Sequence, residues 1–214
     1  MRSFRHWTAR YVRDRILDIA YQRRHPDSPL LTRYAIAILA DWLGATDRGW
    51  EWGSGRSTSW FAARVAHLTS IEHDPHWVGI VTRRLDELGL RERVLYRGCA
   101  LGGEGAGGSP YVGAISSQAD ESLDFCLVDG RLRDLCILAC LPKLRPGGLL
   151  VLDDAHRYIP REPRSHAPFA RSITQGFESE HWRDFYERVA DWRRIWTTDG
   201  IKDTAFWIKP AAVS

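Results

Sequence analysis

The sequence predicts an α/β protein with a doubly wound, mostly parallel sheet, an antiparallel final strand and additional helices at its N-terminus. Short apolar runs typical of strands alternate with longer stretches typical of helices, as in a parallel sheet covered on both faces. The last two strand-like runs flank a tight turn, which favours an antiparallel ending. The chain has 214 residues, 44% of them hydrophobic, and can therefore bury one substantial core.

The composition disfavours several classes of protein. A formal net charge of +3 is too small to indicate a nucleic-acid-binding protein. No apolar run approaches the roughly 18 residues of a membrane-spanning helix, and the N-terminus lacks the apolar segment of a signal peptide. The four cysteines follow no metal-binding CxxC spacing. We therefore expect a cytoplasmic protein with reduced thiols and no membrane span, and the composition disfavours a nucleic-acid partner.

Three segments divide the chain, and we expect them to form one domain over residues 1–214. Residues 1–46 are predicted to form an N-terminal helical cap. Residues 47–154 hold the alternating strands and helices, and residues 155–214 hold a late helix and the closing strands. The arginines of the first two dozen residues leave two interpretations open: a solvated or substrate-covering helix, or a surface that contacts phosphates or a membrane.

Five short runs are predicted to be strands because β-branched, aromatic or leucine side chains fill them. Most are followed by a turn and a helical pattern, which is the order expected of parallel strands. The runs are 48–52 (RGWEW), 68–72 (LTSIE), 93–97 (RVLYR), 124–128 (DFCLV) and 149–153 (LLVLD).

Helices with recognisable ends fill the intervals between these runs. Ser57 and Thr58 can cap a helix after the first strand, and Asp74, followed by proline, begins another after the second. A third helix is expected over about 132–141, where a proline ends it.

Two regions depart from this alternation. The stretch 98–115 holds too many glycines for a stable helix, so we expect either a lid over the site or a surface insertion. Beyond 154, a polar loop leads to an amphipathic helix around 182–189. The runs RRIWTTDG (193–200) and TAFWIKP (204–210) then flank a turn that contains Asp199 and Gly200, and they are predicted to form the antiparallel ending.

The turn after the first strand has the features of a ligand-binding turn. Gly53 and Gly55 allow the backbone to turn tightly and to approach a ligand, while the next helix points free N–H groups at the same place. Glu51, at the end of the first strand, would repel a pyrophosphate and attract an ammonium group. Glu72 ends the second strand about 20 residues on, where a carboxylate can accept both ribose hydroxyls. Together these acids favour a cationic, ribose-bearing ligand over NAD.

Four motifs resemble, in this order, the strand motifs of class I S-adenosylmethionine (SAM)-dependent methyltransferases. They are EWGSGRST (51–58), SIEHDP (70–75), FCLVDG (125–130) and LRPGGLLVLDD (144–154). The resemblance covers residues 47–154 and implies a Rossmann-like methyltransferase sheet with SAM as the cofactor.

The resemblance also implies a role for individual residues. Glu51, Gly53 and Gly55 would hold the methionine part of SAM, and Glu72 would hold its ribose. Ser57 stands where many members have a third glycine, and its hydroxyl can cap the helix and leave room for the ligand. The segment after the third strand would lie near the adenine, namely Gly98, Cys99 and Ala100.

Three carboxylates are expected at the ends of the fourth and fifth strands, where open α/β sheets bind ligands: Asp129, Asp153 and Asp154. Converging carboxylates repel one another unless a cation or hydrogen bonds neutralise them, and oxygen clusters suit Mg²⁺. The pattern is similar to that of the catechol and caffeoyl-CoA O-methyltransferases, which implies Mg²⁺ at these three acids. The alternative is that Asp129 caps the next helix and the other two are hydrogen-bonded loop acids.

Asp129 and His156 are the candidates for catalytic residues. The similar enzymes have a lysine base shortly after the first Asp, whereas Arg131 and Arg133 lie in that interval here. Arginine stays protonated and cannot act as a general base, although it can orient an anionic substrate. His156 follows the acid pair and is the better candidate for proton transfer.

We therefore predict a SAM-dependent methyltransferase that acts on a small-molecule acceptor at oxygen, with or without a divalent metal. Two alternatives stay open. An RNA methyltransferase would share the fold, but the sequence lacks an NPPY-like motif, a Pro-Cys pair and an appended RNA-binding domain. A non-catalytic SAM-binding module would suit the missing lysine base.

Overall fold

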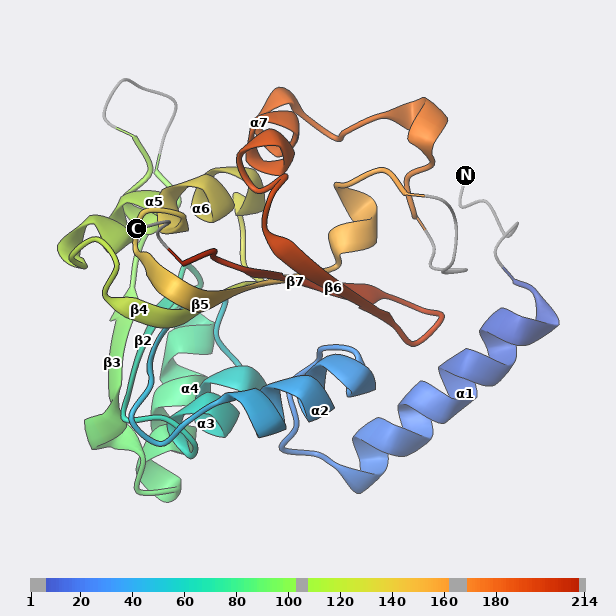
Figure 1. Ribbon diagram of the computed structural model, residues 1–214. Helices are drawn as coiled ribbons and strands as arrows, with labels where there is room; N and C mark the ends of the chain where they lie inside the picture. Colours follow the sequence, from blue (N-terminus) through green and yellow to red (C-terminus); the bar gives the residue numbers. More distant parts are fainter. Residues whose placement is uncertain (1–6, 103–107, 162–168, 212–214) are drawn as a thin grey trace.

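A computed structural model describes residues 7–102, 108–161 and 169–211 and shows a seven-stranded sheet with helices on both faces (Figure 1). The strand order is β3-β2-β1-β4-β5-β7-β6. The strands β1 to β5 are parallel to one another, whereas β7 is antiparallel to both of its neighbours, β5 and β6. This arrangement confirms the fold class that the sequence predicts.

The strands lie close to their predicted positions, with one exception. The predicted strand 149–153 begins five residues earlier, because Leu144 already pairs with Leu123 while Leu149 pairs with Phe125. A bulge in β5, where Gly147 has a φ of 77°, accommodates the additional residues. The bounds are β1 (Arg48–Trp52), β2 (His67–Glu72), β3 (Val94–Gly98), β4 (Leu123–Val128), β5 (Leu144–Asp153), β6 (Arg193–Thr198) and β7 (Asp203–Ile208).

Helices occupy the predicted intervals between strands. The longer ones are α1 (Ala9–Arg24), α2 (Arg33–Trp42), α3 (Arg56–Ala62), α4 (Pro75–Glu87), α6 (Arg133–Cys140) and α7 (Glu180–Arg188). The short ones are α5 (Pro110–Gly113) and the single 3₁₀ turns η1 (Arg91–Arg93), η2 (Ala114–Ser117), η3 (Ala155–Arg157) and η4 (Ile173–Gln175). Part of the predicted glycine-rich lid or insertion is therefore helical, while its middle, residues 103–107, lies outside the described residues.

The helix ends show which capping predictions were correct. Asp74 caps α4, where its side chain accepts hydrogen bonds from the backbone of His76 and Trp77. The cap of α3 was predicted two to three residues too late, since Gly55 occupies the cap position and not Ser57 or Thr58. Thr58 lies inside the first turn, where its hydroxyl accepts the Gly55 N–H.

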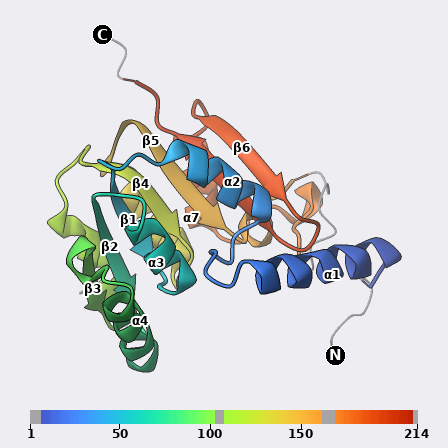
Figure 2. The same ribbon diagram turned by 90° about the horizontal axis from the view of Figure 1, so that it is seen from below.

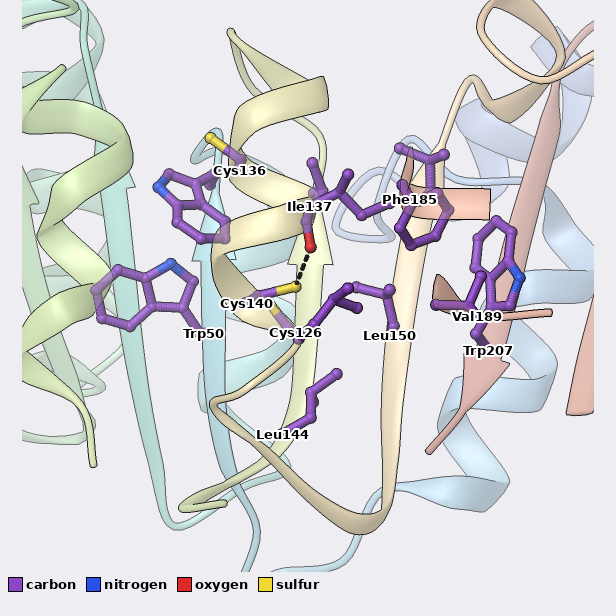
Figure 3. Close-up of a cluster of buried hydrophobic side chains, with 14 of the residues drawn as sticks. Trp50, Cys126, Cys136, Ile137, Cys140, Leu144, Leu150, Phe185, Val189 and Trp207 are labelled. Atoms are coloured by element: carbon purple, nitrogen blue, oxygen red, sulfur yellow. Dashed lines mark hydrogen bonds between the residues drawn. The ribbon is translucent and has the colours of Figure 1, made fainter. Parts of the chain in front are cut away.

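The two faces of the sheet are buried under different helices. On one face α2, α3 and α4 cover side chains such as Phe125 and Phe206. On the other, α5, α6 and α7 cover side chains that include Cys126 and Trp207, and Figure 3 shows part of this cluster. Successive strand residues alternate between these clusters because side chains on a strand point to opposite faces in turn.

The N-terminal helices differ in how they contact the sheet. Ala35, Ile36 and Leu39 of α2 are buried against it. In contrast, α1 lies beside the core and Asp14 is its one buried residue (Figures 1 and 2). In the part of the chain that the structure describes, no helix is long and apolar enough to cross a membrane.

Gly49 should tolerate no larger residue, because a Cβ at this position in β1 would overlap the Phe125 ring. We expect Gly49→Ala to lower the free energy of unfolding by about 1–3 kcal/mol, as overpacking does in other cores. Urea denaturation monitored by far-UV circular dichroism measures this. The matched control is Gly79→Ala in α4, where a Cβ meets no neighbour and should stabilise the helix by up to about 1 kcal/mol. Equal effects of the two substitutions would contradict this packing.

Candidate functional site

A cavity of about 370 Å³ opens at the carboxyl ends of β1, β2 and β4, beside the start of α4. The strand order reverses between β1 and β4, which is where open α/β sheets bind their ligands. A larger hollow of about 540 Å³, around α3 and α4, shares no residue with the glycine turns or the strand-end acids. The first cavity is lined by Gly53, Ser54, Glu72, His73, Asp74, Trp77, Asp129, Gly130, Arg131 and Arg133.

Two glycines allow the turns after β1 and β4 to meet. Gly53 has a φ of 89°, and a Cβ on it would lie 2.7 Å from the backbone of Gly130. A Cβ on Gly130 would in turn overlap the hydroxyl of Tyr111. Larger residues at either position would force these backbones apart, so the floor of the cavity depends on both glycines.

Glu51 lies beneath the first turn and is not among the residues that line the cavity. Its side chain is fully buried, and Oε2 accepts hydrogen bonds from the hydroxyls of Thr58 (2.7 Å) and Ser70 (2.6 Å). Burial raises the pKa of Glu51 to about 7, against the opposing effect of nearby hydroxyls. Its other oxygen, Oε1, has no hydrogen-bond partner within the described ranges.

Glu72 lines the cavity, at the position that the sequence predicts. Its Oε2 accepts hydrogen bonds from the backbone N–H (3.0 Å) and the hydroxyl (3.1 Å) of Ser54. Its Oε1 accepts the backbone N–H groups of His73 (2.8 Å) and Asp74 (2.9 Å). The carboxylate is therefore held between the glycine turn and the start of α4.

Trp77 is a cavity residue that the sequence did not reveal. Its Nε1 donates a hydrogen bond of 2.7 Å to the Ser54 carbonyl, and its side chain is 41% exposed. It lies in the first turn of α4, which begins directly after Glu72. Proximity to this strand end is the available signal in the sequence, whereas the helical spacing of Trp77 with the buried Val81 and Leu85 favours a position in the core.

The remaining predicted cofactor residues are not among those that line the cavity. The Cys99 N–H donates to the Glu72 carbonyl at 2.7 Å, and the Ala100 carbonyl accepts from Tyr111 at 3.2 Å. Gly98 ends β3 beside them. In the first turn region, a Cβ on Gly55 would lie 3.9 Å from the Trp77 ring, while Ser57 is largely buried in α3.

The structure does not support the predicted metal site at Asp129, Asp153 and Asp154. Each acid has a partner of its own: Arg133 for Asp129 (2.8 Å), the Thr204 hydroxyl for Asp153 (2.8 Å) and Arg157 for Asp154 (3.4 Å). Across residues 7–102, 108–161 and 169–211, no group of three or more His, Cys, Asp and Glu side chains is placed to hold a metal ion. The donor set does not fit Mg²⁺, because basic and hydroxyl groups already occupy it.

Asp129 also does not cap α6, because Leu132 occupies the cap position in a left-handed conformation with a φ of 48°. This conformation turns the chain so that Arg133, in the first turn of α6, reaches back to Asp129. Burial, and then the carboxylate of Asp153, raise the pKa of Asp129 to about 8, while Arg133 opposes the shift.

His156 is 3% exposed and is not a cavity-lining residue. Its Nδ1 accepts the backbone N–H of Asp203 at 3.2 Å, which joins the turn after β5 to the start of β7. Burial lowers its pKa, so the neutral form is favoured. This position differs from the solvent-facing one that a proton acceptor after the acid pair would need.

Solved structures share this fold at low sequence identity. A caffeoyl-CoA O-methyltransferase-like protein from Staphylococcus aureus is 14% identical with a TM-score of 0.59, over 92% of this chain and 99% of that chain. An O-methyltransferase from Bacillus cereus, solved with SAH (S-adenosylhomocysteine), is 17% identical with a TM-score of 0.56. The match covers 94% of this chain and 91% of that chain. No protein-family model and no curated protein matches the sequence.

The fold is therefore that of the class I methyltransferases, as the sequence motifs imply. The same fold also occurs in a precorrin 8W decarboxylase from Methanobacterium thermoautotrophicum, 15% identical with a TM-score of 0.52 over 86% of this chain and 92% of that one. Because one fold supports different reactions, the reaction has to be inferred from the site.

The buried Glu51 should make stability depend on pH. In the folded protein Glu51 keeps its proton up to about pH 7, whereas the ordinary pKa of a glutamate side chain is 4.5. Between these two pH values the folded state binds more protons than the unfolded state does. The stabilisation contributed by Glu51 is therefore complete below pH 4.5 and is lost as the pH rises through 7. The shift corresponds to about 3 kcal/mol. Glu51→Gln cannot ionise and should lose correspondingly less stability.

Urea denaturation of both proteins at pH 4.5 and pH 8 measures this difference. The same substitution at the exposed Glu87 is the control. If the stability difference between the natural protein and Glu51→Gln is the same at both pH values, the prediction that Glu51 is buried and protonated in the folded protein is wrong.

Proposed function

We propose that the protein is a SAM-dependent methyltransferase that methylates a small-molecule acceptor at oxygen. The observation that carries this proposal is the Glu72 carboxylate, which lines the switch-point cavity beside a glycine turn. An acid at the end of the second strand can accept both hydroxyls of a ribose. The solved neighbour with bound SAH supports SAM as the nucleoside in question.

The residues present fit this cofactor. The glycine turn at Gly53 lets a ligand approach the backbone closely, and Glu72 would hold the ribose. The unpartnered Oε1 of Glu51 beneath the same turn offers a buried acceptor for an ammonium group or a bridging water. The flat indole of Trp77 provides an apolar wall, and the segment 98–100 would flank the base.

SAM would supply a methyl group already activated by its positive sulfur. The chain then has to bind the acceptor in line with that bond and to exclude water, which is a proximity effect. Asp129 lines the cavity and has a pKa raised to about 8, which is close to the value that suits a proton acceptor near neutral pH. We assign it the proton of the acceptor hydroxyl, and Arg131 the orientation of an acceptor with an anionic group.

SAH should bind the purified protein and stabilise it by about 2.7 kcal/mol at a hundredfold excess over Kd. Glu72→Gln should weaken this binding by about tenfold or more, since hydrogen bonds to a charged acceptor contribute about 1.5–3 kcal/mol. Isothermal titration calorimetry gives both affinities. The control Glu87→Gln, at the exposed end of α4, should bind as the natural protein does.

Transfer of a labelled methyl group from SAM to phenolic, carboxylic or hydroxyl acceptors tests the reaction itself. Failure of both SAM and SAH to bind would refute the proposal. Tight binding with no transfer to any acceptor would instead favour a SAM-binding module without methyltransferase activity.

A further inference from the structure

Arg133, in the first turn of α6, makes four hydrogen bonds to the chain at the ends of β4 and β5. Its Nε donates to the Gly130 carbonyl (2.9 Å), and its Nη1 donates to the Asp153 carbonyl (2.6 Å). Its Nη2 donates to both the carbonyl and the carboxylate of Asp129 (2.8 Å each). The side chain is 14% exposed. One guanidinium therefore joins the ends of β4 and β5.

These contacts use the oxygen atoms that a hard cation would need. Carboxylate and carbonyl oxygens are the preferred ligands of Mg²⁺ and Ca²⁺. Here a planar guanidinium, which stays charged at any physiological pH, takes them instead. A divalent ion placed beside it would meet a fixed positive charge in a partly buried site, where the repulsion is stronger than in water.

The other two acids are also neutralised within the chain. Asp154 pairs with Arg157, and Asp153 accepts from Thr204. Lys202 adds a positive field that favours the ionised form of Asp153. Three basic side chains thus lie around three carboxylates and oppose their mutual repulsion without a bound metal.

We propose that Arg133 occupies the cation position of this strand-end site, so that the protein binds no divalent metal there. Arg133 acts as a positioning residue: it fixes the Asp129 carboxylate against the cavity and closes the site to metal ions. The inference rests on the proposed function only for the choice of site, and its geometry is independent of SAM.

Removing the guanidinium should open a metal site. Titration with MnCl₂, followed by calorimetry and by the electron paramagnetic resonance signal of free Mn²⁺, should show no saturable binding to the natural protein. Arg133→Met should bind one Mn²⁺ with a Kd of roughly 1 mM, as weak carboxylate sites do. Adding Asp129→Asn should abolish that gain. Arg133→Lys keeps the positive charge and should remain unresponsive to Mn²⁺.

The matched control is Arg188→Met. It breaks another i,i+4 Arg–Asp pair of the same 2.8 Å length, formed with Asp184 on the exposed side of α7. It should gain no Mn²⁺ binding. Saturable Mn²⁺ binding to the natural protein that Asp129→Asn removes would overturn the proposal. So would a folded Arg133→Met that binds no Mn²⁺.

Should Arg133→Met fail to fold, the natural protein and its Asp129→Asn variant still decide, because the proposal requires that neither binds the ion. None of these titrations contains SAM, whereas SAH calorimetry contains no metal. A failed methyltransferase assignment and a failed cation assignment would therefore give different results.

Discussion

The candidate site depends on one buried carboxylate, that of Glu51. Burying an acid is costly unless hydrogen bonds compensate, and here hydroxyls from two other elements supply them. Ser70 brings β2 to β1, and Thr58 brings the first turn of α3. Because Thr58 also accepts the Gly55 N–H, the same hydroxyl shapes the glycine turn. The position of this turn at the floor of the cavity therefore follows from hydrogen bonds within the chain.

A second constraint acts where β4 and β5 end. Three acids lie close together there, because the carboxyl ends of neighbouring parallel strands meet at the same edge of the sheet. Arg133 and Arg157 balance two of these charges, and the Thr204 hydroxyl satisfies the third. The turn that begins α6 is part of this solution, since the left-handed Leu132 directs Arg133 back over Asp129. The fold thus leaves the acids in place and replaces an external cation with internal ones.

The sequence predicted the strands well because buried strands need continuous apolar runs, as in LVLD before Asp154. It also predicted Glu72, because a residue that ends a parallel strand has to lie at the ligand edge of the sheet. The structure does not support the predicted metal site, because the spacing of the acids along the chain does not show that the Arg133 side chain reaches back to Asp129, four residues earlier. Ser54 and Trp77 were missed for a related reason. The hydrogen bond from the Trp77 indole to the Ser54 carbonyl depends on the direction of the Trp77 side chain, which the sequence does not show.

We propose that the cavity at the β1 and β4 turns is a nucleoside site in which Glu72 holds the ribose. A crystal structure of the protein grown with SAH would test this. We expect density in the cavity of about 370 Å³, with both ribose hydroxyls within hydrogen-bond distance of the Glu72 carboxylate and Trp77 against the ligand. Density for SAH at any other place, with the Glu72 carboxylate still bound only to Ser54, His73 and Asp74, would contradict it.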